Sequence, residues 1–499
     1  ISTKENYFYF LRRNDAEMKI KELSKLVILI TILSGCSTRP DSSELFSRIE
    51  DEYKNGNFQK LAQLTDSLKL LFPDETRLSG KADSLALISD RIRLDFSLTE
   101  EQFLKKLEGY KLSFNDSLLN VWDKKKWIEW RYIDGEKRYF NRSASNLLLL
   151  KKFHEEKEVI SIENSRDPEM IERLGHTAQV LKVWKENPDS LKPVRIKVTY
   201  TITVDADVVP DGSVIRCWMP FPKENNPRQE NVEILSVSDV DFILSPDSVI
   251  HRSVYMEETA LKGIGTIFQV SFSFQSYPQY LDLSSAKTLP YDKESSLFRK
   301  YTAEQLPQIC FTENVKRTAD RITSPEDTPS EIVIKIYTWF KENIPWTGAL
   351  EYSTMENIPE YVLGNRRGDC GMQTFLYMSM LRYKGIPVRW QSGWKLPPDH
   401  INLHDWCEIY FEGSGWFPSD ISYDLQPTDD KTLKEFFMSG IDSYRMIVND
   451  GVAGSLYPPK EHLRSEPYDF QRGEVEWQGG NLYFDKWDYN MEIEYFEDN

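Results

Sequence analysis

The chain has few of the residues from which metal sites and disulfide frameworks are built. Its 499 residues include only five cysteines and six histidines. No CxxC pair and no HExxH motif occurs, so the common zinc signatures are absent. Scattered thiols in a chain of this length do not form the closely spaced pattern of a disulfide framework. We therefore expect no metal and no cofactor.

Long runs of basic residues are also missing, and the formal net charge is −17. A protein that binds duplex nucleic acid needs a basic patch to neutralise phosphates, so nucleic acid is not expected as a partner. Hydrophobic residues make up 40% of the chain and aromatic residues 13%, which excludes wholesale disorder. The length predicts two to four domains.

The apolar run near the N-terminus is too short to span a membrane. It covers residues 26–33, whereas a membrane-spanning helix needs roughly 20 residues. Lysines precede it and Ser34-Gly35-Cys36 follows it, which is the order of a secretory signal. The alternative is a buried core segment that ends in an ordinary cysteine.

The ending Leu33-Ser34-Gly35-Cys36 resembles the lipobox of bacterial lipoproteins. That resemblance implies cleavage before Cys36 and lipidation of the new N-terminal cysteine. Met18 stands where a start codon is expected, so residues 1–36 are interpreted as an over-extended start followed by a lipoprotein signal peptide. We therefore expect an exported bacterial lipoprotein, periplasmic or at the outer membrane or cell surface, anchored by its N-terminal lipid.

Residues 37–190 are predicted to form a mostly helical domain. Apolar residues recur near helical spacing from Leu45 to Leu71, and the pattern stops at Phe72-Pro73. The stretch 127–132 breaks this pattern and predicts a strand or hairpin around Asp134-Gly135. We interpret the region as a packing or spacer domain.

The period of the pattern changes at residue 194. Apolar residues then alternate over 195–204 and over 268–274, which is typical of strands with one buried face. Several such strands predict a β-sandwich over residues 194–290. Residues 431–499 are rich in aromatic, acidic and glycine residues and predict a β-rich extension that closes with a hairpin at Gly479-Gly480.

Residues 291–430 contain the pattern that points to chemistry. Gly368 permits a tight turn, and Cys370 is predicted to open a helix that runs to about Tyr383. A thiol at a helix N-terminus feels the positive end of the helix dipole, which favours the nucleophilic thiolate. The Cys370 side chain is therefore the candidate nucleophile.

Two strands are predicted after this helix, over 388–394 and 403–410. Because side chains alternate along a strand, His404 and Trp406 share one face, and Asp405 and Cys407 share the other. We therefore interpret Cys407 as a core thiol and Asp405 as poorly placed to orient its neighbour. A hairpin near residues 412–415 is expected to bring Asp420 beside His404, as a third group that holds the base.

Five motifs in this order resemble the transglutaminase-like superfamily over roughly residues 330–430. They are Gly-x-Cys370, Leu381-Arg382 with 385–389, Ser392-Gly393-Trp394, His404-x-Trp406-x-Glu408 and Gly415-Trp416-x-Pro418-x-Asp420. The resemblance implies a papain-like core, a helix packed on an antiparallel sheet, with Cys370, His404 and Asp420 as the catalytic triad. It also makes Trp346, Trp394 and Trp406 candidates for the oxyanion site or substrate pocket. Asp405 departs from the small or apolar residue that is common in the family.

The expected fold is thus a multidomain α+β protein with a helical region, a β-sandwich and a transglutaminase-like core. The expected function is cysteine-dependent acyl transfer at an amide bond of a protein or peptide, as a peptidase or amidase. A transglutaminase would use the same acyl-enzyme and an amine acceptor. A surface binding or assembly protein with an inactive core is the third possibility.

Overall fold

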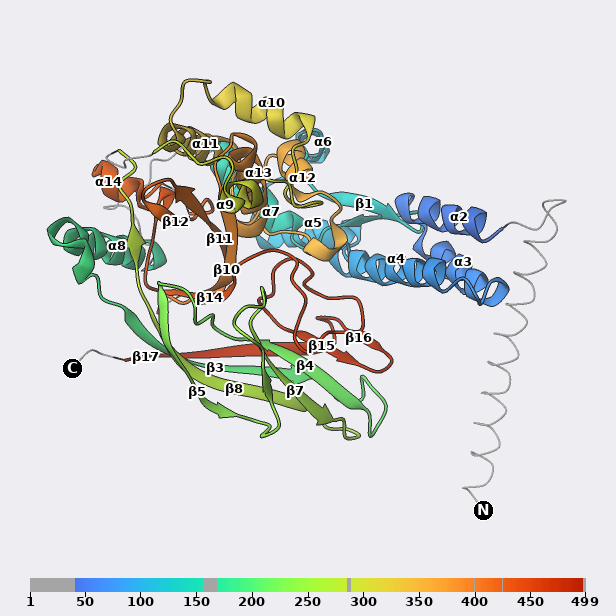
Figure 1. Cartoon of the computed structure of the whole chain (residues 1–499). Coiled ribbons are helices and arrows are strands. Elements are labelled where there is room, and N and C mark those ends of the chain that lie inside the picture. The colour runs from blue at the N-terminus through green and yellow to red at the C-terminus, as the bar shows by residue number, and fades with distance from the viewer. Residues whose placement is uncertain (1–40, 156–167, 285–288, 399, 424, 497–499) are drawn as a thin grey trace, which may run out of the picture. The chain divides into compact units, whose positions relative to one another are not determined.

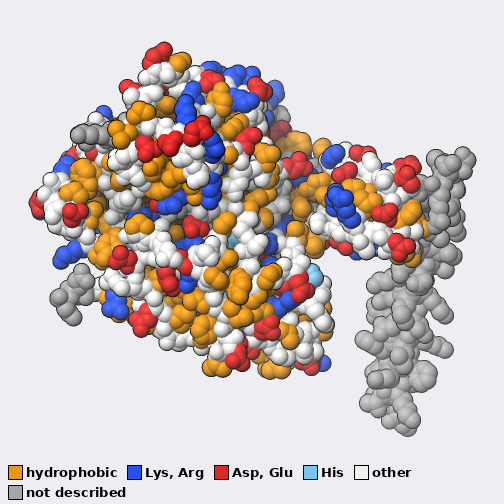
Figure 2. All heavy atoms as spheres, viewed as in Figure 1, with side chains coloured by type: hydrophobic (Ala, Val, Ile, Leu, Met, Phe, Trp, Pro, Cys, Tyr) orange, Lys and Arg blue, Asp and Glu red, His pale blue; other side chains and the backbone are white. Residues whose placement is uncertain are grey.

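The computed structural model describes most of the chain after residue 40. The described ranges are 41–155, 168–284, 289–398, 400–423 and 425–496. The predicted signal segment, with Cys36, lies outside the described residues. Among those that are described, no helix is long and apolar enough to cross a membrane. Acidic and basic side chains are interspersed over the face that Figure 2 shows.

The chain forms two compact units. Of the described residues, the first contains 41–103 together with Trp130–Asn141, and the second contains Leu104–Glu129 and those from Arg142 on. The predicted helical region 37–190 is therefore divided between the two units, because its hairpin at 130–141 returns to the first helices. Local periodicity does not reveal such a division.

The first unit is built from helices and one hairpin. Its complete elements are α2 (Ser42–Lys54), α3 (Phe58–Leu71), α4 (Thr76–Asp95), β1 (Trp130–Ile133) and β2 (Glu136–Tyr139). The three helices bury Leu45, Ile49 and Leu61 in one apolar cluster. Gly56, in the turn between α2 and α3, has φ +74°, and a Cβ there would lie 2.3 Å from the carbonyl oxygen of Tyr132. This turn therefore needs glycine. The helices and the hairpin are confirmed.

The second unit contains two antiparallel sheets that share one apolar core (Figure 1). Their strands are β3 (Val194–Val204), β4 (Val214–Pro220), β5 (Gln229–Val237), β6 (Ile243–Leu244), β7 (Ser253–Thr259), β8 (Thr266–Ser276), β15 (Glu474–Trp477), β16 (Gly480–Leu482) and β17 (Trp487–Phe496). One sheet has the order β17-β3-β8-β5 and the other β16-β15-β4-β7-β6. Alternate residues of β3 are buried, as the sequence pattern predicts.

The C-terminal strands belong to these sheets. β15 pairs with β4, and β17 pairs with β3 from Trp487 opposite Val204 to Phe496 opposite Arg195. β15 and β17 are therefore part of the sandwich, where a separate extension was expected. β17 covers an edge of β3 that would otherwise present unpaired backbone groups. Pairing between strands so distant in sequence leaves no local signal.

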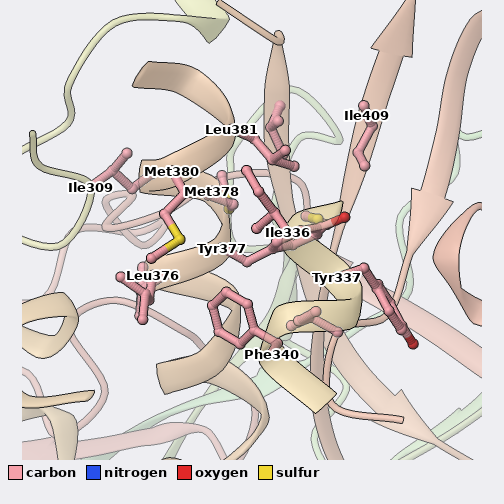
Figure 3. Packing of buried hydrophobic residues seen from close by; sticks show 14 of the residues in the cluster. Ile309, Ile336, Tyr337, Phe340, Leu376, Tyr377, Met378, Met380, Leu381 and Ile409 are labelled. Atoms are coloured by element: carbon pink, nitrogen blue, oxygen red, sulfur yellow. The ribbon is translucent and has the colours of Figure 1, made fainter. Parts of the chain in front are cut away.

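The core region combines a four-stranded antiparallel sheet with buried helices. The sheet order is β12-β11-β10-β14, formed by β10 (Val388–Lys395), β11 (Asn402–Phe411), β12 (Gly415–Ser419) and β14 (Arg445–Asn449). Against it packs α13 (Cys370–Tyr383), and α10 (Glu313–Ile322), α11 (Pro329–Asn343) and α12 (Ile358–Asn365) pack against α13 in the same apolar cluster. Figure 3 shows Phe340 of α11 beside Leu376 and Tyr377 of α13 in this cluster.

The helix α13 begins and ends where the sequence predicts, and all but its first and last residues are buried. The predicted capping box of α11, between Thr328 and Glu331, is also present. On the sheet face that packs against α13, further along the strands, Trp394 and Met446 join the core of the sandwich, and on the opposite face Trp406 packs with Ile441 and Ile447. The sheet is therefore covered on both sides, which fixes the direction of each β11 side chain.

The remaining elements are short or peripheral. They are α5 (Glu100–Gly109), α6 (Asp116–Lys124), α7 (Ser143–Glu155), α8 (Pro168–Glu186), α9 (Ser296–Tyr301), α14 (Lys431–Lys434), β9 (Gln279–Tyr280), β13 (Gly440–Ile441) and 3-10 turns at Pro188–Ser190, Tyr352–Thr354 and Phe436–Met438. The molecule is thus an α+β protein with N-terminal helices and antiparallel sheets.

Candidate active site

Cys370 is the first residue of α13 and is partly exposed. The preceding residue, Asp369, is the N-cap, and its Oδ1 accepts a hydrogen bond from the N–H of Met372 at 3.0 Å. Aspartate is among the residues most favoured at this position, because it satisfies an N–H that the helix leaves unpaired. The predicted placement of the thiol at a helix N-terminus is confirmed.

The Cys370 side chain lines a cavity of about 270 Å³. Ligand pockets usually measure about 300–1,000 Å³, so this cavity has room for one residue or a short peptide segment. Its walls are mainly polar, and they come from the start of α13, the segment 346–352, the start of β11 and the segment 465–472. Trp346, 46% exposed, is also in the wall.

The group that contacts the thiol is the carboxyl group of Asp405. The Cys370 Sγ donates a hydrogen bond to Asp405 Oδ2 at 3.3 Å. The other oxygen, Oδ1, accepts from Nε2 of Gln471 at 2.7 Å, and the same Nε2 lies 2.9 Å from the carbonyl oxygen of His404. Gln471 thus fixes Asp405 in position, and a thiol, a carboxyl group and an amide form a continuous chain of hydrogen bonds.

The close approach of Asp405 depends on Gly371, the second residue of α13. A Cβ at this position would lie 2.3 Å from the hydroxyl oxygen of Tyr352 and 2.7 Å from Asp405 Oδ2. The Tyr352 hydroxyl in turn donates to Asp369 Oδ1 at 2.5 Å. The absence of a side chain at 371 therefore allows two polar groups to reach the start of the helix.

Burial and neighbouring negative charges raise the pKa values of the acidic groups in the cavity. Burial, together with the charges of Asp405 and Asp369, raises the pKa of the Cys370 thiol well above its usual value. Burial and the neighbouring acids Asp469 and Asp369 raise the pKa of Asp405 well above that of an ordinary aspartate. Burial raises the pKa of Asp369 to about 6. In the resting protein Cys370 is accordingly a thiol.

His404 and Asp420 meet on the opposite face of β11. The His404 Nε2 donates to Asp420 Oδ2 at 2.7 Å, and Nη1 of Arg445 donates to the same oxygen at 2.8 Å. Asp442 holds the remaining side of the Arg445 guanidinium. Burial alone would raise the pKa of Asp420, but His404 and Arg445 hold it well below the usual range. Burial lowers the pKa of His404, although Asp420 acts in the opposite direction.

The structure thus brings two of the predicted site residues together but not all three. The expected pairing of His404 with Asp420 is present, whereas no hydrogen bond joins His404 to Cys370 in the described part of the chain. The reason is the alternation of side chains along β11. Pairing of the strand with β10 and β12 fixes this alternation, so rotation about a side-chain bond leaves His404 on its own face.

The tryptophan candidates also separate. Of the three, Trp346 alone is in the wall of the cavity. Trp394 is fully buried and donates from Nε1 to the carbonyl oxygen of Gln471, and buried Trp406 donates to Gln391 Oε1. These two are corrected from pocket candidates to core residues. Trp406 lies on the His404 face, away from α13, and Trp394, opposite Leu403 in the register, packs into the core of the sandwich.

Sequence reasoning missed that Asp405 contacts the thiol and that Gln471 holds Asp405 in place. Cys407 is a buried core thiol on the side of α13, as predicted. Asp405 is two residues before Cys407 on the strand and shares its face, so a Cys407 that packs on α13 implies that Asp405 also faces the helix. No comparable signal existed for Gln471, which reaches the site from the segment before β15.

The comparisons with known proteins agree with this core. The model of the Transglutaminase-like superfamily matches residues 316–421, which form a domain of that superfamily. No protein of curated function matches the chain.

The solved structures that match the chain include a candidate cysteine protease from Cytophaga hutchinsonii. It is 14% identical with a TM-score of 0.40, over 62% of this chain and 92% of that one. Another is the periplasmic domain of TgpA from Pseudomonas aeruginosa, 15% identical with a TM-score of 0.26, over 52% of this chain and 94% of that one. A candidate protease from Parabacteroides distasonis is 12% identical with a TM-score of 0.18, over 42% and 62% of the two chains.

Proposed function

We propose that Cys370 is the nucleophile of acyl transfer at an amide bond of a peptide or protein, with hydrolysis as the outcome. Transglutaminase-like domains are often catalytic. The observation that carries the proposal is the hydrogen bond from the Cys370 thiol to Asp405, at a helix N-terminus that opens into a cavity. A nucleophile, a proton acceptor and a group that holds the acceptor are the parts that such a reaction needs.

In the proposed reaction Asp405 is the base. It takes the thiol proton as Sγ of Cys370 bonds to the carbonyl carbon, and the carbonyl oxygen becomes an oxyanion. The N–H of Cys370 is the proposed oxyanion donor. The proton then passes from Asp405 to the leaving amine as the C–N bond breaks. A water molecule, deprotonated by Asp405, hydrolyses the thioester and restores the thiol. An aspartate with a raised pKa suits this work near neutral pH.

The alternative assignment keeps His404 as the base and Asp420 as the group that orients it. It follows from the resemblance of the motifs, and it requires the imidazole to reach Cys370. The pairing of His404 with Asp420 on the other face of β11 favours Asp405. In the first assignment the His404–Asp420 pair is structural, and it links β11 to the end of β12 and to β14.

Amine transfer is the second outcome open to the same acyl-enzyme, since an amine can replace water at the thioester. We place hydrolysis first because the motifs that guide this proposal carry no feature specific to an amine acceptor. The resemblance of residues 33–36 to a lipobox adds the proposal that the protein is an exported, lipid-anchored enzyme. Palmitate labelling that persists in a Cys36→Ala variant would exclude the anchor.

The test of the function is peptide cleavage that depends on Cys370. A peptide library is incubated with the wild type, with Cys370→Ala and with Cys310→Ala, and the products are identified by mass spectrometry together with any labelled amine incorporated. Cys310 is a buried cysteine with no place in the cavity, so its variant is the matched control. Cleavage lost only in Cys370→Ala supports the proposal. Cleavage that survives Cys370→Ala contradicts it, and a library left intact by the wild type favours a binding protein.

A further inference from the structure

The cavity beside Cys370 holds more acidic than basic side chains. Its walls contain the carboxyl groups of Glu351, Asp369, Asp405, Glu466 and Asp469, and the guanidinium groups of Arg142 and Arg472. Buried carboxylates are normally paired with a cation or with hydrogen-bond donors. We therefore ask which of these carboxyl groups the protein itself supplies with a cation or with hydrogen-bond donors.

Two of the acids share one cation within the protein. Arg472 donates to the two oxygens of Glu351 at 3.1 and 2.7 Å, and its Nε donates to Oε1 of Glu466 at 2.6 Å. Oε2 of Glu466 accepts from the backbone N–H groups of Gln471 and Arg472. Each of the three guanidinium nitrogens of Arg472 thus donates to a carboxylate oxygen, and both oxygens of Glu351 and of Glu466 have donors.

The three aspartates have no such cation. Asp369 accepts from the Tyr352 hydroxyl and a backbone N–H, and Asp405 accepts from Cys370 and Gln471, all of them neutral donors. Arg142 lowers the pKa of Asp369 from a distance, but no ion pair joins it to the three aspartates among the described residues. The aspartates therefore act on one another by repulsion.

Asp469 is the least satisfied of the three. Its side chain lines the cavity, and the residue is 8% exposed. Within the described ranges, no other residue donates a hydrogen bond to its carboxylate. Burial and the charge of Glu466 raise its pKa well above the usual value. Its own backbone N–H is the donor that lowers this pKa, and a carboxylate with so few donors leaves room for a ligand with donors and a positive charge.

We propose that Asp469, with Asp369 and Asp405, binds a primary ammonium group of the substrate next to the bond that Cys370 attacks. This inference rests on the proposed function and names the substrate class of the same site. An ammonium group offers three donors and one positive charge. The described residues contain no cluster of three or more His, Cys, Asp or Glu side chains placed to hold a metal ion, so an organic cation fits better. The cavity admits the end of a peptide or one lysine side chain.

The two sources of an ammonium group predict different peptides. An α-ammonium group comes from the N-terminus of a peptide, and cleavage would then fall close to that end. An ε-ammonium group comes from a lysine side chain, and cleavage would then fall beside an internal lysine. The α-ammonium and the ε-ammonium group would bind to the same aspartates, so the two sources are distinguished by which peptide binds.

The test measures binding by calorimetry to the full chain carrying Cys370→Ala, which prevents turnover. Three probes are compared: a trialanine amide with a free N-terminus, its N-acetylated form, and an N-acetylated alanyl-lysyl-alanine amide. We expect one charged probe to bind at least about tenfold more tightly than the neutral probe. Asp469→Asn in the same background should remove that difference. Glu326→Gln, which removes one exposed charge elsewhere, should preserve it.

Equal binding of charged and neutral probes overturns the inference, as does a preference that survives Asp469→Asn. If Asp469→Asn does not fold, the comparison of charged and neutral probes on the Cys370→Ala protein still tests whether the cavity prefers an ammonium group. Binding is measured separately from cleavage. Cys370-dependent cleavage without preferential binding of the charged probes would support the proposed function and remove this inference. Preferential binding of a charged probe without Cys370-dependent cleavage would support the ammonium site and remove the proposed function.

Discussion

His404 and Asp405 are consecutive residues of β11, and their side chains leave the strand on opposite faces. Asp405 meets the thiol of Cys370 at 3.3 Å, and His404 meets Asp420 at 2.7 Å. Strand alternation therefore decides which of the two side chains contacts the thiol, since a shift of one position exchanges the two faces. The predictions below follow from this arrangement.

The first prediction concerns the reactivity of the Cys370 thiol. Burial and two nearby carboxyl groups raise its pKa, so alkylation by iodoacetamide should be slow at pH 7 and should accelerate above pH 9. Asp405→Asn removes one negative charge and should increase the rate at pH 7 by about tenfold for each unit by which the pKa falls. The labelled peptide is quantified by mass spectrometry.

Glu326→Gln is the control for a change of charge alone and should leave the rate of alkylation unchanged. Rapid labelling that is already constant between pH 5 and pH 7 would contradict this prediction. It would mean that Cys370 is a thiolate paired with a cationic imidazole, as the assignment to His404 requires.

The second prediction concerns Gly371. A methyl group there would collide with the Tyr352 hydroxyl and with Asp405, so Gly371→Ala should displace Asp405 from the thiol and reduce Cys370-dependent cleavage at least about a hundredfold. Addition of Tyr352→Phe removes one of the two collisions and should restore part of the rate. Activity is compared at equal concentrations of folded protein.

Gly364→Ala is the matched control, because a Cβ at this position in α12 meets no atom within 4 Å. It should keep full activity and leave the free energy of unfolding unchanged or raised by about 0.4–1 kcal/mol. If Gly371→Ala were as active as Gly364→Ala, the contact between Cys370 and Asp405 would have no part in catalysis.

The third prediction concerns the stability of the pair on the other face. Asp420 is fully buried and Arg445 is 1% exposed, so Arg445→Met leaves buried carboxylates without their cation. The free energy of unfolding should fall by about 3–5 kcal/mol in urea. Arg299→Met, which removes a highly exposed ion pair with Glu294, should cost about 0–1 kcal/mol.

The ion pair between Asp420 and Arg445 should also make the free energy of unfolding depend on pH in the acidic range. The pKa of Asp420 is lowered in the folded state, so its contribution is present above the unfolded pKa of about 3.9 and is lost as the pH falls further. The difference in unfolding free energy between wild type and Arg445→Met should therefore narrow below pH 4. A difference that is independent of pH would show that the guanidinium stabilises the fold through packing alone.

The fourth prediction concerns Asp469. Its pKa is raised in the folded state, so its contribution to stability is complete below pH 4 and is lost as the pH rises. Asp469→Asn should therefore raise the free energy of unfolding by about 1–3 kcal/mol at pH 8 and have little effect at pH 4. The groups that face it are Glu466, Asp369, Asp405 and the cation Arg472. A loss of stability at pH 8 would show that Asp469 already has a partner.

Much of the core could be predicted from the sequence because its signals are local. The cap of α11, the extent of α13 and the alternation in β3 and β11 each depend on neighbouring residues. The pairing of β17 with β3 and the arrival of Gln471 at Asp405 depend on distant segments and had no such signal. The position of Asp405 was accessible from its face of the strand, but the motif drew attention to His404.

The most direct test of the account compares the rates of Cys370-dependent peptide cleavage by Asp405→Asn and His404→Gln. The account predicts that Asp405→Asn loses about 10²–10⁴-fold in rate, because it removes the base. His404→Gln should stay within about tenfold of the wild type for the same amount of folded protein. A large loss in His404→Gln with near-normal cleavage by Asp405→Asn would contradict the account and assign the base to His404.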